Sequence, residues 1–418
     1  MLNSYKSGSK APSPKNGASS SRRSARKRAR GVTLIELMIA MALGLAIIAA
    51  VGYVYLSGTQ GYRVQDAQSR MQEDARFVID TLSRDIRMAG YFGCARGDLA
   101  YATSTGSHVE VKAMQPVMTL DLSWWMLSGN DNSARDRFVN PAFNLRGFSG
   151  STALAAQALP ASVVSIGTTS GRRPGTDVLM IIRSSEDGQN LIPTDESGAA
   201  NPTVMDQAKF TLPATIPGVS SGEAVTAVVS DCRVAKIIKP TWTINASTKA
   251  VAVSIDNGVN AHATLGAGEA GDLGGKFKED AVVSVFSPSL YFVSQPSSAN
   301  LRPTLRRLSI GSTPVNYGGW ANNGGTIVAT GVETFTTSYI VTTQRGTSTA
   351  TSTEFTLADM EANPDQAVWN DVTAVRIRFT MVSQNENVAI QSADNLLRQN
   401  YDFTVGIRSR QYSGTDAR

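Results

Sequence analysis

The sequence has little of what most catalytic and metal sites need. It holds two cysteines and two histidines in 418 residues, and His108 and His262 both lie in polar stretches rich in Gly, Ser and Ala. Together they do not form the ligand spacing of a zinc site. The segment Gly218–Gly222 (GVSSG) matches a nucleophile elbow, but a proline precedes it and no helical pattern follows. The acidic stretch Asp131–Asp136 lacks the ligand period and the glycine of a calcium loop. We therefore expect no enzymatic activity, no cofactor and no metal.

A basic surface is also missing from most of the chain. The formal net charge is +5, but residues 1–31 hold nine Lys and Arg residues and no acid, which leaves 30 basic against 34 acidic side chains elsewhere. The positive charge therefore belongs to the N-terminal segment, and no nucleic-acid partner is expected. With 42% apolar and 17% charged residues the remainder is typical of a folded protein of one large or two modest domains.

Long apolar runs are absent except for one. Leu37–Leu56 (LMIAMALGLAIIAAVGYVYL) holds twenty residues without a charge. At about 1.5 Å per helical residue this run spans roughly 30 Å, the thickness of the hydrocarbon core of a bilayer. Nine positive charges precede the run, and the first after it is Arg63. The positive-inside rule predicts a single-pass inner-membrane protein with a cytoplasmic N-terminus and a periplasmic C-terminal part.

Three interpretations of this N-terminus compete. A conventional secretory signal needs a cleavage site behind the apolar run, whereas the small-residue pattern Ala40–Ala42 lies inside it. A plain uncleaved signal anchor is favoured by hydrophobicity alone. The third interpretation rests on the junction Arg30–Leu37 (RGVTLIEL), where a basic residue and a glycine precede a glutamate that opens the apolar helix.

This junction resembles the class III signal of type IV pilins and pseudopilins. The resemblance implies that a prepilin peptidase removes the leader, residues 1–31, by cutting between Gly31 and Val32, and that the new N-terminus at Val32 is methylated. Phe is usual where Val32 stands. Glu36 becomes the fifth residue of the mature chain.

Glu36 is costly in a membrane helix, by up to about 2.5–3.5 kcal/mol if it lies at the bilayer centre. Near the cytoplasmic end it could simply extend its carboxylate to water. In a filament it could neutralise the free α-ammonium of Val32 on an adjacent subunit. Such a pair strengthens as water is excluded, and it would set the axial register of packed helices.

The helical pattern continues beyond the apolar run. Apolar residues recur with a mean spacing close to 3.6 from Val64 to Ala89, and charged residues, among them Arg84 and Asp85, are expected on the opposite face. Gly90 is expected to end the helix. The sequence predicts a helix over residues 32–91, on the order of 87 Å long from Val32 to Ala89. Its first part (32–56) is the membrane and assembly stem, and its second part (57–91) is amphipathic and should lie on a sheet.

Residues 92–418 are predicted to form a β-rich periplasmic domain. The clearest strand is Val372–Val382, in which apolar and polar residues alternate. Further strands are expected at Val178–Ile182, Ala224–Val229, Val234–Ile238, Ala281–Phe286, Thr326–Ala329, Phe335–Val341 and Asp402–Ile407. The Gly/Ser/Thr-rich stretches 151–175, 186–223, 255–276 and 311–325 are predicted to be loops and insertions. A helix followed by strands indicates an α+β fold, with the helix packed on an antiparallel sheet that carries large loop insertions.

Export to an oxidising periplasm favours a disulfide between Cys94 and Cys232. The bridge would close a loop of 138 residues and would tie the segment after the helix to the sheet. Two unrelated buried thiols are the alternative.

Four segments resemble the minor pilin family PilW: Arg84–Cys94 (RDIRMAGYFGC), Gly175–Leu179, Ser230–Cys232 and Trp369–Phe379. The resemblance is good over the helix, moderate over the core strands and slight in the loops. It implies a pilin-like fold and a minor pilin that helps initiate type IV pilus assembly in a tip or priming complex with other minor pilins and the major pilin. Twitching motility and cell adhesion are the processes it implies. A type II secretion pseudopilin and a membrane-anchored periplasmic adhesin or hydrolase are the alternatives.

Overall fold

The computed structural model describes two compact parts of the chain, one up to Gln60 and one from Gly61, and we describe each by itself. The described residues are 31–93, 95–96, 110–113, 145–150, 167, 171–193, 209–216, 219, 221–222, 225, 227–230, 234–238, 240–245, 251–254, 281–296, 301–309, 325–343, 350–362, 369, 371–384 and 394–408.

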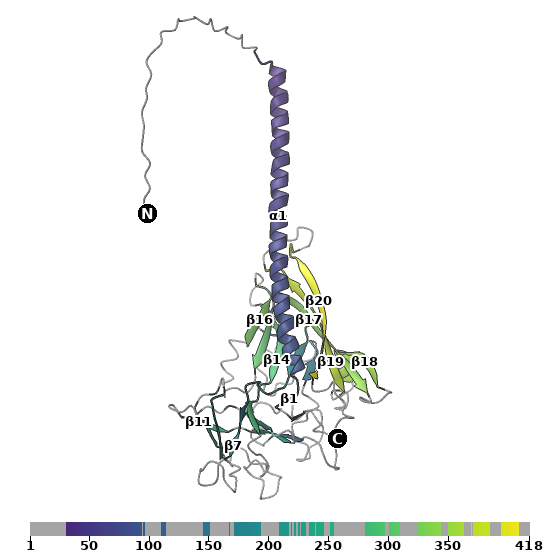
Figure 1. Ribbon diagram of the computed structural model, residues 1–418. Helices are drawn as coiled ribbons and strands as arrows, with labels where there is room; N and C mark the ends of the chain where they lie inside the picture. The colour runs from purple at the N-terminus through teal and green to yellow at the C-terminus, as the bar shows by residue number, and fades with distance from the viewer. Residues whose placement is uncertain are drawn as a thin grey trace, which may run out of the picture. The chain divides into compact units, whose positions relative to one another are not determined.

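The first part is the apolar half of a single helix. Helix α1 (Leu34–Arg87), purple in Figure 1, confirms the helix predicted from the sequence. It is the one helix among the described residues that is long and apolar enough to cross a membrane, and its apolar window is not buried by the rest of the chain.

In the second part α1 buries one face. The buried residues recur at helical spacing and match the predicted apolar face: Ala67, Met71, Ala75, Val78, Leu82 and Ile86. Gly90 adopts a left-handed backbone (φ 74°), and its N–H donates to the carbonyl of Ile182 at 2.8 Å. The predicted helix stop is therefore confirmed.

The expectation that Asp85 belongs to the exposed face was wrong. Asp85 is 3% exposed, beside Ile86 in the buried row. Its carboxylate has buried partners on the strands, so the cost of desolvation is offset by charged hydrogen bonds that a pattern of apolar residues cannot reveal.

Two antiparallel sheets share one core with this half of α1. The first has the order β16-β15-β14-β5-β4, and the second β18-β17-β19-β20. Their strands are β4 (Leu145–Phe148), β5 (Val178–Ile181), β14 (Ser289–Ser294), β15 (Thr304–Ser309), β16 (Thr326–Thr330), β17 (Val332–Thr343), β18 (Thr351–Thr356), β19 (Val372–Val382) and β20 (Arg398–Gly406). The short helix α7 (Leu357–Ala362) follows β18 and adds Met360 to the core.

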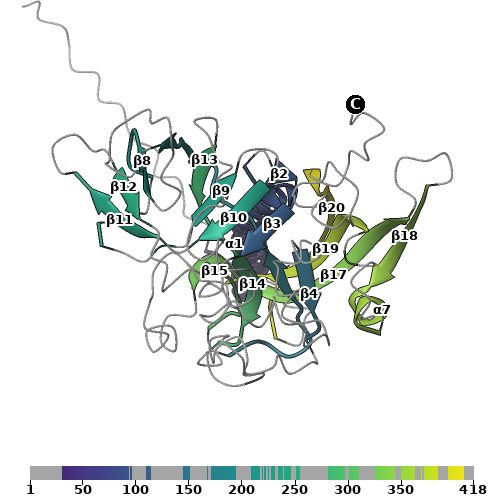
Figure 2. The same ribbon diagram turned by 90° about the horizontal axis from the view of Figure 1, so that it is seen from below.

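A second core belongs to an inserted β-sandwich. One of its sheets has the order β3-β10-β9-β13-β6 and the other β11-β12-β8-β7. The strands are β3 (Glu110–Ala113), β6 (Gln189–Asn190), β7 (Ile192–Pro193), β8 (Lys209–Leu212), β9 (Ala227–Ser230), β10 (Val234–Ile238), β11 (Thr241–Ile244), β12 (Val251–Ser254) and β13 (Val282–Val285). β3 and β10 pair in parallel; every other strand pair in the described chain is antiparallel. Figure 2 shows β8, β11 and β12 on one side and β17–β20 with α7 on the other.

The prediction that residues 186–223 form a loop was wrong, because part of this stretch belongs to the sandwich. This stretch contributes β6, β7 and β8 and buries Leu191, Phe210 and Ile216. Trp242 lies in the same core, and its indole N–H donates to the carbonyl of Val225 at 3.0 Å. The strands are short and separated by polar residues, so alternation is too brief to be read from the sequence.

A two-stranded hairpin of β1 (Tyr91–Phe92) and β2 (Ala95–Arg96) follows α1. The architecture is α+β, as predicted: a long N-terminal helix followed by mainly antiparallel sheets.

Candidate functional site

The candidate site is the segment that leads into α1. Gly31, Val32 and Thr33 precede the helix and are exposed. The N–H of Leu37 donates to the carbonyl of Thr33 at 3.2 Å, which places the first helical hydrogen bond beyond Val32. The predicted scissile bond between Gly31 and Val32 therefore lies in non-helical, exposed backbone.

Thr33 and Glu36 form a reciprocal cap at the start of α1. The backbone N–H and the hydroxyl of Thr33 both donate to Oε2 of Glu36 at 2.9 Å. The N–H of Glu36 donates in return to the Thr33 hydroxyl at 3.3 Å. This is the capping-box arrangement, which satisfies backbone donors that have no partner inside the helix.

The cap gives Glu36 a structural role that sequence reasoning missed. The signal was present, because Thr33 and Glu36 fit the Thr-x-x-Glu pattern directly before an apolar run. The cap also fixes the carboxylate at the positive end of the helix dipole. Both hydrogen bonds that Thr33 donates to Glu36 end on Oε2, so Oε1 of Glu36 takes part in neither.

An apolar surface follows directly on the cap. Large apolar side chains between Leu34 and Leu56 are 54–76% exposed, with Leu34 and Tyr53 at the upper end. A continuous surface of this kind needs lipid or other apolar helices around it. The segment therefore combines an accessible peptide bond, a fixed carboxylate and an uncovered apolar helix.

Several residues named from the sequence lie outside the described chain. They are Cys94, Cys232, His108, His262 and the stretch Asp131–Asp136. Among the described residues there is no group of three or more His, Cys, Asp or Glu side chains that could hold a metal.

The neighbours in sequence of the two cysteines are close in space. A Cβ atom built on Gly93 would lie 3.1 Å from the Cβ of Ser230. Gly93 adjoins Cys94, and Ser230 stands two residues before Cys232.

Comparison with known proteins bears on the same segment. The family described as the prokaryotic N-terminal methylation motif matches residues 26–52, which include Gly31, Val32 and Glu36. The N-terminal segment is pilin-like. The pilin-like protein PilA3 of Thermus thermophilus is 39% identical over 62 residues, 15% of this chain. The match spans only about a quarter (26%) of the length of that protein. No solved structure matches the chain.

The motif and the apolar helix together indicate a single-pass membrane anchor of the kind found in type IV pilins and pseudopilins. A motif of this kind implies processing by a prepilin peptidase.

Proposed function

We propose that this protein is a minor pilin that helps to initiate and assemble the type IV pilus. The leader is removed between Gly31 and Val32, Val32 is methylated, and the apolar stem moves from the bilayer into the filament. The observation that carries the proposal is the uncovered, charge-free run Leu37–Leu56 of α1, most of which lies within the match to the methylation motif. Such a helix can exchange lipid for neighbouring pilin stems without exposing apolar surface to water.

Glu36 is the residue that would recognise a neighbouring subunit. Its carboxylate is held by Thr33 through Oε2, and Oε1 can accept from the α-ammonium of a neighbour's Val32. The attraction between these opposite charges rises as the stems exclude water, because the local dielectric constant falls. The cap and the pair are compatible, since each uses a different oxygen.

Substitution of Glu36 tests this role. Glu36→Ala should still be cleaved and methylated, but it should be missing from pili sheared off the cells. Glu73→Ala is a matched control, since Glu73 is exposed on the same helix away from the motif. Normal recovery of Glu36→Ala with sheared pili would contradict the charge pair.

A deletion strain separates the proposed role from its alternatives. Loss of surface pili and twitching motility with normal type II secretion is expected of a pilus initiation protein. Loss of secretion with normal pili would instead assign the chain to a type II pseudopilus. Normal pili and normal secretion would leave the anchored adhesin or hydrolase.

We also propose that Cys94 and Cys232 are bridged, which the closeness of Gly93 to Ser230 supports. The Cβ atoms of bridged cysteines lie about 3.5–4.5 Å apart, a separation that such neighbours can provide. On the chain-entropy model a loop of this length contributes about 4.7 kcal/mol or somewhat more. Two reactive thiols in the unfolded, unreduced protein would refute the bridge.

A further inference from the structure

The inserted β-sandwich adjoins the rest of the second part at a short two-stranded joint, which we define as Arg183–Ser185 and Val285–Ser287. Strand β3 of the same sandwich comes from the chain between β2 and β4. The N–H of Ser185 donates to the carbonyl of Val285 at 2.7 Å, and the N–H of Ser287 donates to the carbonyl of Arg183 at 2.9 Å. Ser184 and Phe286 form a β-bridge between them. These two segments carry the chain into and out of the strands β6–β13.

The end of α1 lies against the joint. The N–H of Ser184 donates to the carbonyl of Tyr91 at 2.7 Å, and the Ser184 hydroxyl donates to the same oxygen at 3.0 Å. The Ser185 hydroxyl accepts from the N–H of Val285 at 3.1 Å. The helix terminus, the joint and the first hairpin are therefore one hydrogen-bonded unit.

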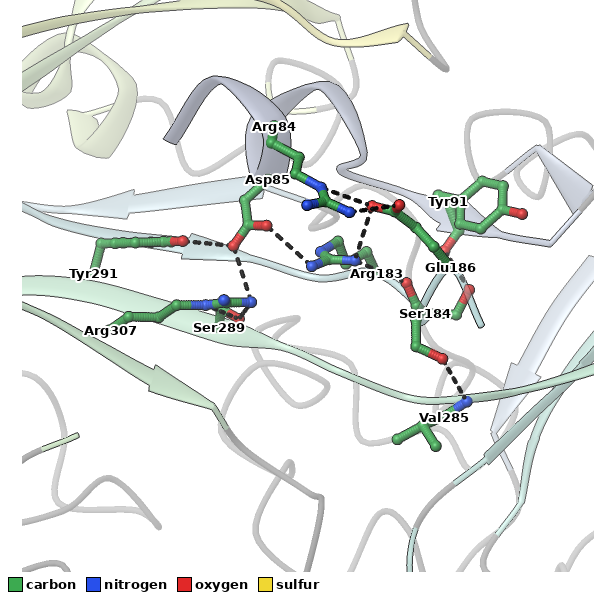
Figure 3. Close-up of polar contacts among 11 residues, drawn as sticks. Arg84, Asp85, Tyr91, Arg183, Ser184, Glu186, Val285, Ser289, Tyr291 and Arg307 are labelled. Carbon is green, nitrogen blue, oxygen red and sulfur yellow. Dashed lines mark hydrogen bonds and ion pairs between the residues drawn. The ribbon is translucent and has the colours of Figure 1, made fainter. Parts of the chain in front are cut away.

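A buried carboxylate lies at the centre of this unit (Figure 3). Oδ1 of Asp85 accepts from Nη2 of Arg183 at 3.0 Å. Oδ2 accepts from the hydroxyl of Tyr291 at 2.5 Å and lies 3.1 Å from Nη2 of Arg307. Asp85 thus binds the joint, β14 and β15 at once, and burial beside this carboxylate raises the pKa of Tyr291, which keeps its hydroxyl a donor.

A second ion pair repeats the connection at the surface. Arg84 donates from Nε and Nη2 to the two oxygens of Glu186 at 3.1 and 2.8 Å. Arg183 approaches the same glutamate at 4.0 Å. Consecutive residues of α1, Arg84 and Asp85, therefore hold residues 183 and 186 of one segment.

We propose that Asp85 locks the inserted sandwich to the end of α1, so that a force on the sandwich passes to the helix through one rigid body. If the joint opens and Arg183 moves away, the buried Asp85 carboxylate loses one of its two arginines and Oδ1 loses its hydrogen bond, which is strongly unfavourable. A helix shifted by one residue would carry Asp85 away from Arg183, Tyr291 and Arg307 together. The lock depends on this part of the chain alone and does not require the proposed pilus function.

Hydrogen exchange on the full chain in detergent micelles tests the lock. Asp85→Asn should speed exchange of the joint amides, those of Ser184, Ser185 and Ser287, about a hundredfold or more. The amides of β9 in the sandwich and β19 in the main core should keep their rates. Asp402→Asn is the matched control, because Asp402 also binds two arginines but on an exposed sheet face; it should leave the joint amides unchanged.

Unchanged joint amides in Asp85→Asn would overturn the proposal, and so would an equal rise at all amides, since Asp85 would then support the whole core and no particular joint. If Asp85→Asn does not fold, the same exchange measurement on Tyr291→Phe tests the lock, because this variant removes one hydrogen bond to Asp85 and keeps the aromatic ring. A rise of about tenfold confined to the joint supports the lock. No rise, or a rise throughout the chain, refutes it.

Discussion

The packing of α1 in the second part can be tested by truncating its buried face. Leu82 is fully buried in the core that α1 shares with the two main sheets. Leu82→Ala removes three buried carbons and leaves a cavity, which costs about 2.7–5 kcal/mol where the surroundings do not collapse. Alanine is the slightly better helix former, so helix propensity offsets only a few tenths of a kcal/mol of this cost. We expect Leu82→Ala to lower the free energy of unfolding by about 3 kcal/mol.

Phe77→Ala is the matched comparison, because Phe77 lies five residues earlier on α1 and is 56% exposed. It should change the free energy of unfolding by no more than about 0.5 kcal/mol, as surface substitutions usually do. Urea unfolding in micelles, followed by circular dichroism in the strand region, measures both. Equal losses for the two variants would show that Leu82 is not packed as described.

Three further predictions follow from other parts of the molecule. Thr33→Val should weaken the first turn of α1 by about 1 kcal/mol, while Thr33→Ser should not, as measured by hydrogen exchange of that turn in micelles; equal exchange would contradict the cap. Gly331→Ala should cost about 2 kcal/mol or more in urea unfolding, because Gly331 has a φ of 90° and a Cβ there would lie 2.5 Å from a carbonyl oxygen at the end of β19. Gly175→Ala, also at positive φ but in open space, should cost less, and the reverse order would be inconsistent with the structure. Hydrogen bonds from Arg84 lower the pKa of Glu186, so the unfolded chain binds more protons and the stabilisation present at neutral pH is lost as the pH falls through the acidic range. Glu186→Gln should therefore reduce the loss of stability between about pH 6 and about pH 3, which lie above and below the usual carboxyl pKa. An unchanged dependence of the free energy of unfolding on pH would refute this linkage.

Local periodicity was enough to predict the main elements. The buried face of α1 follows a spacing of three and four residues, and β19 has the predicted ends, Val372 and Val382. In both elements one face is buried and the other is solvated, so apolar and polar residues recur with the period of the helix or of the strand.

Two strands of the first main sheet, β14 and β15, were missed. All six residues of β14 are buried, so Ser289–Ser294 shows no alternation, and its signal was an apolar run between Pro288 and Pro296. β15 was missed because two arginines, Arg306 and Arg307, stand at its centre. Their partners come from elsewhere in the chain: Arg307 binds Asp85 and Ser289. Such long-range pairing leaves no local pattern.

The candidate site was predicted in part. Gly31, Val32 and Glu36 follow from the motif and its position before the apolar run, and the family match covers all three. The capping role of Thr33 was visible in the sequence but was not considered. The lock at Asp85 could not be predicted, because its partners lie about 100 and 200 residues away, as in the Arg183 and Tyr291 contacts.

Mass spectrometry of the mature N-terminus tests the central claim most directly. Protein recovered from cell membranes or sheared pili should begin at Val32 and carry a methyl group on its α-nitrogen. A chain that still begins at Met1 while pili assemble normally would contradict the account, because Val32 would then have no free amine for Glu36 to meet.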